Sequence, residues 1–261
     1  MHITNKGLIL PKIYIQKMGN NHVYVLLAVR NGERYIRYAI ESVLNQTHQN
    51  FNIFILVNGC TDNTQKIVNE YSVQYPTKIK DFTMLNDANK SGSLNYGISI
   101  ALDYASKLYG FPKSEWFAIQ DADDVWHPTK LEEQLKYANA YDVIGTDCYY
   151  IDAQSKEIEI NPRPRPFLHD KIVEDAYNGH NPIVNCSALI RANLMQQFPY
   201  NPELDGIEDY DLWLRIMRYT DSKFINIPQK LVDHRIHANS HFNTKNYTEK
   251  INQLIQTYKQ K

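Results

Sequence analysis

The sequence predicts an α/β fold in which a largely parallel β-sheet is flanked by helices. Continuous apolar runs such as Val23–Val29 and Phe51–Val57 are typical of strands that are buried on both faces of a sheet. Segments with apolar residues at helical spacing follow such runs repeatedly. Strand–helix units in series form a parallel sheet through right-handed crossovers. With 261 residues, 43% of them hydrophobic, the chain can bury a core of its own without disulfide or metal support.

Four strand–helix units fill the chain up to Tyr141. We expect their strands at 23–29, 51–57, 79–85 and 116–120, each rich in apolar residues. Thr61–Asn63 offers an N-cap to the second helix, Gly110 a C-cap to the third, and Pro128 suits the first turn of the fourth. The apolar positions at helical spacing are Ile36, Ala39, Ile40, Val43, Leu44, Ile67, Val68, Tyr71, Leu94, Ile98, Leu102, Ala105, Leu108, Leu131 and Leu135.

Beyond Tyr141 the pattern is less regular. An amphipathic helix is expected at 206–219, and Pro162, Pro164 and Pro166 interrupt any regular element before it. Residues 1–21 are expected to form an appended arm, and residues 245–261 a short polar helix. Extended segments are expected at 142–152, 157–160, 183–190, 223–227 and 231–236.

Composition argues against several classes of protein. The formal net charge is −1, which provides no electrostatic footprint for nucleic acid or for an anionic membrane. The longest apolar runs are far shorter than the ~20 residues of a transmembrane helix. No signal peptide opens the chain, and Cys60, Cys148 and Cys186 lack metal-type or redox-type spacing. We therefore expect a cytoplasmic protein that binds no nucleic acid and has no transmembrane segment.

Polar residues follow the expected strands at the sheet edge where ligands bind in doubly wound folds. Among them, Asp121–Asp124 places three carboxylates within four residues. Crowded carboxylates repel each other unless a cation compensates, and oxygen ligands favour Mg²⁺ or Mn²⁺. The alternative is a solvated acidic turn that caps the next helix. The position directly after a buried strand, ahead of Trp126 as a candidate pocket wall, favours the metal site.

A second acidic cluster opens the expected helix at 206–219. Asp209 and Trp213 are four residues apart and therefore share one helix face. An indole beside a carboxylate raises its pKa and makes it a candidate general base near neutral pH. The alternative is an acidic first turn that complements the helix dipole, an interpretation that suits Glu208 and Asp211 better than Asp209.

His234 and His237 form a third candidate group. Their spacing is compatible with zinc, but the sequence has no Cys or His nearby at a matching spacing, so we do not predict a zinc site. An isolated histidine is structural more often than it is a ligand, and His237 gains weight as a candidate metal ligand only from the motifs that precede it.

Five motifs occur in order along the chain: Val23–Glu33, Ala39–Thr47, Asn58–Thr64, Asp121–Asp124 and Glu208–Arg215. Together they resemble the family 2 glycosyltransferases, which have the GT-A nucleotide-sugar-binding fold. The resemblance covers residues 22–240, and Asp-x-Asp alone would be weak evidence. It implies an inverting enzyme that transfers a sugar from a nucleoside-diphosphate sugar to a hydroxyl of a glycan, lipid-linked or protein-linked acceptor, with Mn²⁺ or Mg²⁺ as cofactor. A lipid-linked acceptor would place the protein at a membrane periphery.

The resemblance also implies residue roles. Asp123 and His237 would hold the metal, and Asp124 would support them or cap the next helix. Val57 and Asn58 replace the two aspartates that contact the base in the family, which puts uridine recognition in doubt because valine accepts no hydrogen bond. The nucleotide-sugar contacts implied by the resemblance are Ala28, Arg30, Asn58, Lys90, Asp121 and Ala122, with Lys90 at the diphosphate and Asp121 at the ribose.

On the acceptor side, the resemblance places the general base at Asp209, with Glu208 as the alternative base or an acceptor ligand and Trp213 as an acceptor contact. Residues 180–187 resemble a segment that lines the acceptor site, although turn chemistry explains Asn181–Pro182 equally well. We divide the domain at 22–244 into a nucleotide-sugar-binding part (22–126) and an acceptor-binding and catalytic part (127–244).

Two other functions remain open at this point. A nucleotidyltransferase would need a glycine-rich phosphate loop after the first strand, and residues 30–33 are poor in glycine. A catalytically inactive sugar-nucleotide-binding module would not need Asp123, Asp209 and His237, all of which are present.

Overall fold

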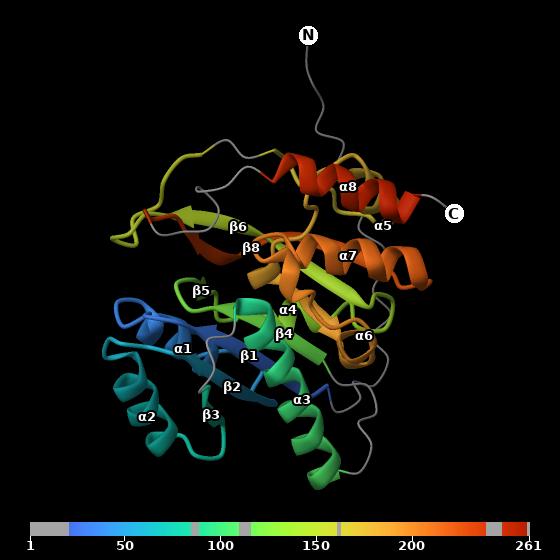
Figure 1. Cartoon of the computed structure of the whole chain (residues 1–261). Helices are drawn as coiled ribbons and strands as arrows, with labels where there is room; N and C mark the ends of the chain where they lie inside the picture. Colours follow the sequence, from blue (N-terminus) through green and yellow to red (C-terminus); the bar gives the residue numbers. More distant parts are fainter. Residues whose placement is uncertain (1–20, 85–88, 110–115, 161–162, 239–246, 260–261) are drawn as a thin grey trace.

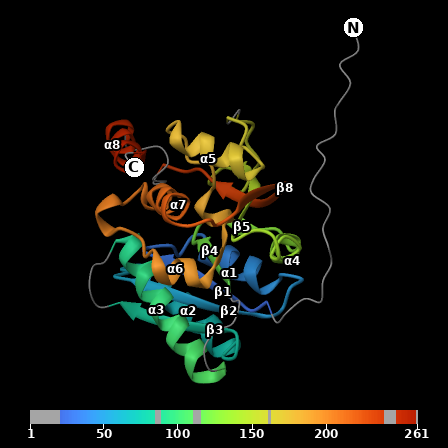
Figure 2. The same cartoon turned by 90° about the vertical axis from the view of Figure 1, so that its right-hand side faces the viewer.

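The computed structural model describes residues 21–84, 89–109, 116–160, 163–238 and 247–259. One eight-stranded sheet, in the order β3-β2-β1-β4-β7-β6-β8-β5, runs through the molecule. Helices cover both faces of the sheet (Figures 1 and 2). The arm expected at residues 1–21 lies outside the described residues except for Asn21.

The N-terminal half confirms the predicted strand–helix units. Strands β1 (Val23–Val29), β2 (Phe51–Asn58), β3 (Ile79–Met84) and β4 (Trp116–Asp121) are parallel to one another. The helices that follow them are α1 (Ile36–Leu44), α2 (Thr64–Gln74), α3 (Lys90–Tyr109) and α4 (Lys130–Leu135). The expected cap at Gly110 lies outside the described residues.

Alternation along the strands builds a core on each face of the sheet. Val23, Val25 and Leu27 of β1 belong to the core that α1, α2 and α4 cover. Tyr24 and Leu26 point the other way, into the core that α3, α6 (Ala192–Gln197) and α7 (Glu208–Tyr219) cover. Because side chains of a strand alternate between faces, a continuous apolar run is what a doubly covered sheet requires.

The C-terminal half departs from the expected strands. The segments expected at 223–227 and 231–236 form one strand, β8 (Phe224–Arg235), which lies parallel to β6 (Val143–Ile151). The segment expected at 157–160 is no strand, since only Glu157 makes a bridge to Ile151. The short β5 (Val125–Trp126) pairs with β8.

The strand expected at 183–190 was wrong over most of its length. Residues Asn185–Ser187 form a turn of 3-10 helix, and of the expected segment only its last two residues belong to a strand, β7 (Leu189–Arg191). The hydroxyl of Ser187 donates to the carbonyl of Val184, a local hydrogen bond that competes with sheet pairing. Strand β7 pairs antiparallel with both β4 and β6 and thereby joins the two halves of the sheet.

Three helices close the top of the molecule in Figure 1. Helix α7 follows the prediction, α8 (Thr248–Lys259) is the expected polar helix, and α5 (His169–Tyr177) was not predicted. Helices α5 and α8 pack on α7 through a small apolar cluster that contains Ala176, Leu214 and Ile255. None of the described helices combines the length and apolar character needed to cross a membrane.

Candidate active site

Two loops at the carboxyl ends of β1 and β2 are joined by side-chain hydrogen bonds. The Oδ1 of Asn31 accepts from the backbone N–H of Thr61 at 2.8 Å, and the N–H of Gly32 donates to Thr64 Oγ1 at 2.8 Å. Asn31 has a φ of 51°, a left-handed conformation that asparagine tolerates better than most residues. This pairing fixes the loops that are expected to surround the nucleotide.

The predicted nucleotide contacts lie around these loops. Ala28 sits between Leu56 and Asp121 in the sheet register, so the end of β1 adjoins the acidic loop. Arg30 is exposed just after β1, whereas Asn58 is 4% exposed at the end of β2. The side chain of Val57 is buried in the apolar core, away from any base.

Each carboxylate of the acidic loop has its own basic partner. Asp121 Oδ1 lies 2.7 Å from the Nζ of Lys90, at the start of α3. Asp123 Oδ2 lies 3.0 Å from the Nε2 of His237. The third carboxylate, Asp124, pairs with His234. The loop is therefore not a solvated acidic turn, because its charges are held by groups from distant parts of the sequence.

The pKa values of the adjacent carboxyls Asp123 and Asp124 move in opposite directions. Burial, together with the charges of Asp124 and Asp121, raises the pKa of Asp123. Burial also acts to raise the pKa of Asp124, but the charge and hydrogen bond of His234 outweigh it and lower that pKa. The ionised form of Asp123 is thus less favoured than that of Asp124, and the carboxyl group faces an imidazole, a donor set that suits a divalent cation.

Asp124 is a buried structural anchor instead of a helix cap. Its Oδ2 lies 2.9 Å from His234 Nδ1, and its Oδ1 accepts from the backbone N–H of Arg235 at 2.8 Å. The negative charge raises the pKa of His234 to about 9 although burial acts to lower it. His234 is therefore an imidazolium paired with Asp124, and it fixes the acidic loop to the end of β8.

A thiol completes this buried group. Cys186 Sγ lies 3.7 Å from His234 Nδ1, and one ligand atom each from Asp124, Cys186 and His234 lie within 4.8 Å of one another. Our sequence analysis found no cysteine near the two histidines because Cys186 is remote in sequence. Burial, followed by the charge of Asp124, raises the pKa of the Cys186 thiol well above its ordinary value. The Cys186 thiol and the His234 imidazolium are thus both protonated. The group is therefore explained as an ion pair of His234 with Asp124, with a neutral thiol beside it.

Arg235 and Tyr35 are site residues that the sequence analysis did not identify. The buried Arg235 donates from Nε to the carbonyl of Asp123 at 2.7 Å and from Nη1 to that of Asp152 at 2.8 Å. Its guanidinium lies over the ring of Tyr35 at 4.4 Å, and the centroid of that ring is 5.4 Å from that of His237, with the two ring planes tilted by 33°. The sequence offered one indication of a site role for Arg235, namely its position between the candidate residues His234 and His237.

The second acidic cluster places one carboxyl group in the site. Asp209 Oδ2 accepts a 2.7 Å hydrogen bond from the side-chain amide of Asn181. Burial, followed by the charge of Glu208, raises the pKa of Asp209 to about 7. Glu208 itself is 5% exposed, accepts from the N–H of Gly206 at 2.6 Å, and lies 4.0 Å from Lys90. The two neighbours therefore have different surroundings, as their spacing on the helix predicts.

Two tryptophans occupy positions that differ from our expectations. Trp213 is fully buried in the core between α7 and the sheet, which leaves it no surface for the expected contact with an acceptor. Trp126 is 2% exposed and donates from Nε1 to the carbonyl of Cys186 at 3.0 Å, so it is not an exposed pocket wall. Apolar residues at helical spacing usually pack in the core, and burial of a large aromatic side chain stabilises the fold more than burial of a smaller one.

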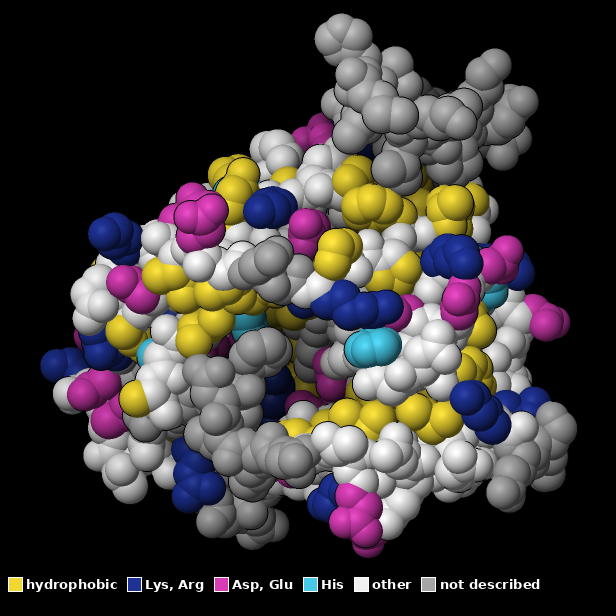
Figure 3. All heavy atoms as spheres, turned by 90° about the horizontal axis from the view of Figure 1, so that it is seen from above, with side chains coloured by type: hydrophobic (Ala, Val, Ile, Leu, Met, Phe, Trp, Pro, Cys, Tyr) yellow, Lys and Arg dark blue, Asp and Glu magenta, His cyan; other side chains and the backbone are white. Residues whose placement is uncertain are grey.

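Lys90 connects the two acidic clusters. Its ammonium group contacts Asp121 at 2.7 Å and lies 4.0 Å from Glu208, next to Asp209 in α7. Burial acts to lower the pKa of Lys90, but the charges of Asp121 and Glu208 outweigh it and raise that pKa well above its ordinary value. On the face shown in Figure 3, acidic and basic side chains are interspersed and some lie inside a central hollow.

Comparison with known proteins gives a consistent result. The profile of the family described as Glycosyl transferase family 2 matches residues 24–198. An uncharacterized glycosyltransferase of Haemophilus influenzae is 29% identical over 83% of the chain, and the O-antigen biosynthesis glycosyltransferase WbnJ of Escherichia coli is 30% identical over 84%. The chain spans 66% of the length of the first protein and 81% of the second.

Solved structures show the same fold. S. aureus TarS (residues 1–349) in complex with UDP-GlcNAc has a TM-score of 0.67 and 15% identity, with 91% of this chain and 66% of that chain covered. The mannosyltransferase PcManGT from Pyrobaculum calidifontis, in complex with GDP-Man and Mn²⁺, has a TM-score of 0.62 and 14% identity, with 84% and 58% covered. The fold is therefore that of the GT-A glycosyltransferases, as predicted.

Proposed function

The chain belongs to glycosyl transferase family 2, and from this premise we propose that it is an inverting, metal-dependent enzyme. It transfers a sugar from a nucleoside-diphosphate sugar to a hydroxyl group of an acceptor. The observation that carries this proposal is the contact of Lys90 with both acidic clusters, 2.7 Å from Asp121 and 4.0 Å from Glu208. The ammonium group of Lys90 thus links the acidic loop, which suits a metal-bound diphosphate, to helix α7. That helix carries Asp209, whose pKa is about 7.

The residues present fit a divalent cation. Asp123 and His237 would hold it, since the pKa of Asp123 is raised by burial and by two neighbouring carboxylates that a cation would offset. Mn²⁺ or Mg²⁺ bound there would stabilise the charge of the departing diphosphate. Arg235 holds the carbonyl of Asp123 and thereby fixes the loop that carries the carboxylate.

We assign the donor to the loops after β1, β2 and β4. Asp121 would bind the ribose, Lys90 the diphosphate, and Asn58 the base, with Ala28, Arg30 and Ala122 at the sides of the pocket. Asn58 offers one donor and one acceptor where an acidic residue would offer acceptors only. We therefore propose a weaker preference for uridine than an acidic contact would give.

Asp209 is the general base in this proposal. The acceptor hydroxyl attacks the anomeric carbon, Asp209 takes the hydroxyl proton, and the bond from that carbon to the diphosphate oxygen breaks. The nucleoside diphosphate leaves with the bonding electron pair. Because attack and departure take place on opposite faces in one step, the anomeric configuration inverts. A pKa of about 7 matches this proton transfer near neutral pH.

The acceptor side comprises Asp209, Glu208 and the segment that carries Asn181. We propose a hydroxyl-bearing glycan or glycoconjugate as acceptor. We also propose that transfer takes place in the cytoplasm, where the free thiols of Cys60, Cys148 and Cys186 stay reduced.

Hydrolysis of UDP-, GDP- and TDP-sugars by the full chain, with Mn²⁺, Mg²⁺ or EDTA, tests the function. We expect hydrolysis that depends on the divalent cation, and loss of metal-dependent nucleoside-diphosphate affinity in Asp123→Ala with an unchanged circular dichroism spectrum. Asp103→Ala is the matched control, because Asp103 is an exposed carboxylate that pairs with Lys107 on α3.

Three results would contradict parts of this proposal. Undiminished nucleoside-diphosphate binding in EDTA would rule out the metal site. A preference for UDP of about a hundredfold or more would mean that another residue reads the base. Binding without hydrolysis or transfer would favour the inactive sugar-nucleotide-binding module, and release of pyrophosphate from a nucleoside triphosphate and a sugar phosphate would favour a nucleotidyltransferase.

A further inference from the structure

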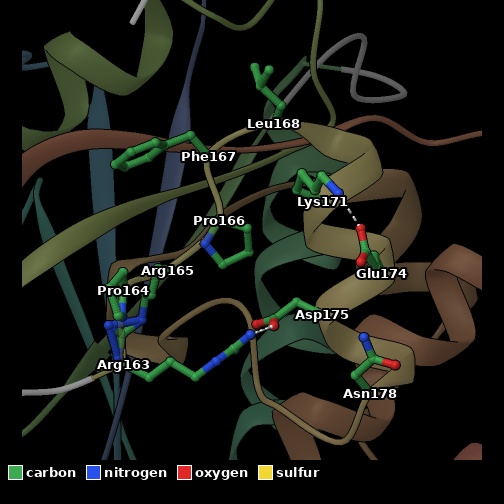
Figure 4. A pocket seen from close by; sticks show the side chains of 10 residues that line it. All are labelled: Arg163, Pro164, Arg165, Pro166, Phe167, Leu168, Lys171, Glu174, Asp175 and Asn178. Atoms are coloured by element: carbon green, nitrogen blue, oxygen red, sulfur yellow. Dashed lines mark hydrogen bonds and ion pairs between the residues drawn. The ribbon is translucent and has the colours of Figure 1, made fainter. Parts of the chain in front are cut away.

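A cavity of about 360 Å³ lies between residues 163–168 and helix α5. In Figure 4 the side chains of Arg163 and Asp175 point toward each other from these two elements. A volume of this size exceeds that of several water molecules and can take a small charged group with part of the molecule that carries it. None of its lining residues belongs to the proposed donor site or takes part in the proposed proton transfer.

Arg163, Arg165 and Lys171 contribute positive charge to the cavity wall, and two of the three form close ion pairs. Arg163 pairs with the buried carboxylate of Asp175, and Lys171 Nζ lies 2.5 Å from Glu174 Oε2. The ion pair of Arg165 is longer, because its Nη1 lies 3.8 Å from Asp147 Oδ1. This distance is too long for a hydrogen bond.

The guanidinium of Arg165 is also short of hydrogen bonds. It offers five N–H donors, and within the described part of the chain the one bond it makes runs from Nη2 to the hydroxyl of Tyr150 at 3.1 Å. Its Nε is buried without a hydrogen-bond partner, and the side chain as a whole is 17% exposed. A buried donor left unpaired costs free energy, which a bound acceptor group would recover.

Asn226 connects the wall of this cavity to the segment that carries Asn181. Its side-chain amide donates to the carbonyl of Pro166 at 2.8 Å and to that of Pro182 at 2.9 Å. Pro182 directly follows Asn181, which binds the proposed base Asp209. The ring of Tyr150 meets the ring of His234 edge-on at 5.8 Å. Chains of direct contacts thus link the cavity wall to the proposed base and to the partner of the acidic loop.

We propose that Arg165 binds an oxyanion, a phosphate or a carboxylate, that the acceptor carries. The proposal rests on the function proposed above and names the chemical class of its acceptor. The planar guanidinium presents Nε and one Nη to two oxygens of such a group, a geometry that lysine cannot reproduce. A neutral sugar would leave the Nε of Arg165 unpaired and would gain nothing from its charge.

Binding is tested first, without donor and in EDTA, so that the metal site does not contribute. Calorimetric titration of the full chain with inorganic phosphate and with sodium glucuronate separates the two oxyanions. We expect saturable binding of at least one of them, weakened about tenfold or more in Arg165→Gln and less in Arg165→Lys. Arg37→Gln is the matched control, since Arg37 is an exposed arginine paired with Glu70 on the other half of the sheet.

Transfer is then compared among a methyl glycoside, its 6-phosphate and the corresponding uronate. We expect the anionic acceptors to have the higher kcat/KM, and Arg165→Gln to raise their KM while kcat changes little. A melting curve shows whether Arg165→Gln folds. If it does not, the wild-type enzyme is tested at high salt instead, where we expect the higher kcat/KM for anionic acceptors to be lost.

Equal binding of phosphate and glucuronate by wild type and Arg165→Gln would overturn the proposal, as would equal kcat/KM for neutral and anionic acceptors. Failure of the proposed function itself is recognised separately, because the wild-type chain would then hydrolyse no donor sugar with Mn²⁺ or Mg²⁺.

Discussion

At Asp209 a single carboxyl group combines a proposed chemical role with a cost in stability. Burial and the charge of Glu208 disfavour its ionised form, while the amide of Asn181 and the charge of Lys90 favour it. The balance leaves the pKa at about 7, compared with an ordinary value of 3.8. A base must accept a proton at working pH, so the same burial that makes Asp209 useful makes its ionisation unfavourable.

We predict that Asp209→Asn lowers the rate of transfer about a hundredfold or more, because asparagine keeps the shape but takes no proton. Nucleoside-diphosphate affinity should change little, since the base contacts the acceptor. Steady-state kinetics and nucleotide titration measure the two effects. In the wild type, activity should rise with pH through a midpoint near 7, where Asp209 loses its proton.

Glu208→Gln is the comparison variant for this prediction. It should reduce activity less and shift the midpoint of the pH profile to lower pH, because a neighbouring negative charge is removed. If Glu208→Gln abolished turnover while Asp209→Asn kept more than about a tenth of it, the base would be Glu208.

We also predict that Asp209→Asn raises the melting temperature, and more so at pH 8 than at pH 4. The folded pKa of about 7 lies above the ordinary value of 3.8, so the unfolded chain ionises first as pH rises between them. Stability is therefore lost across this interval, and the loss is complete above the folded pKa. Asparagine has no such loss. Equal melting temperatures of the two proteins at pH 8 would contradict the raised pKa.

At the scale of elements, the pairing of β6 with β8 determines how the proposed acceptor side is built. Gly145 of β6 lies opposite Asn226 of β8, and a Cβ at Gly145 would overlap with Asn226 Oδ1. The absence of a side chain at 145 therefore gives Asn226 the space to hold the carbonyls of Pro166 and Pro182. Gly145 is therefore needed because the side chain of a residue on the neighbouring strand comes close to its Cα.

We predict that Gly145→Ala destabilises the protein by about 2–4 kcal/mol, from overpacking and from the displaced amide of Asn226. Urea unfolding measures the change. Asn226→Ala should be destabilising by itself, and the double variant should cost no more than Asn226→Ala alone, because the overlap is then gone. Additive effects of the two substitutions would contradict this explanation.

At the scale of the whole molecule, Lys90 stands where two parts of the fold meet. It begins α3, which packs on β1 and β2, and its ammonium group reaches toward the first turn of α7. Asp121 and Glu208, its two partners, are far apart in the chain but share this one cation. A donor diphosphate would enter beside a cation that contacts carboxylates from both parts of the fold.

We predict that Lys90→Gln shifts the midpoint of the pH profile to higher pH, opposite in direction to Glu208→Gln. The charge of Lys90 lowers the pKa of Asp209, so its removal raises that pKa. The profile of kcat at saturating donor isolates this effect from weaker donor binding. Lys107→Gln, an exposed lysine of the same helix, should leave the midpoint unchanged. An unchanged midpoint in Lys90→Gln would show that the two groups are not coupled.

The sequence by itself determined the parallel half of the sheet, the helix of Asp209 and the acidic loop after β4. Strands such as Val23–Val29 are buried on both faces, so their apolar runs carry an unambiguous local signal. The pattern of α7 is equally local, because its apolar and acidic residues are separated around one helix.

Only the tertiary structure decided how the C-terminal half is arranged and which groups meet in the site. The segment at 185–187 turns instead of extending because Ser187 bonds locally, and Trp213 serves the core although its spacing to Asp209 suggested a site role. The contacts of Lys90 with Asp121, of His234 with Asp124 and of Asn226 with Pro166 join residues that are far apart in the chain. Such contacts depend on strand order and packing, which no local pattern specifies.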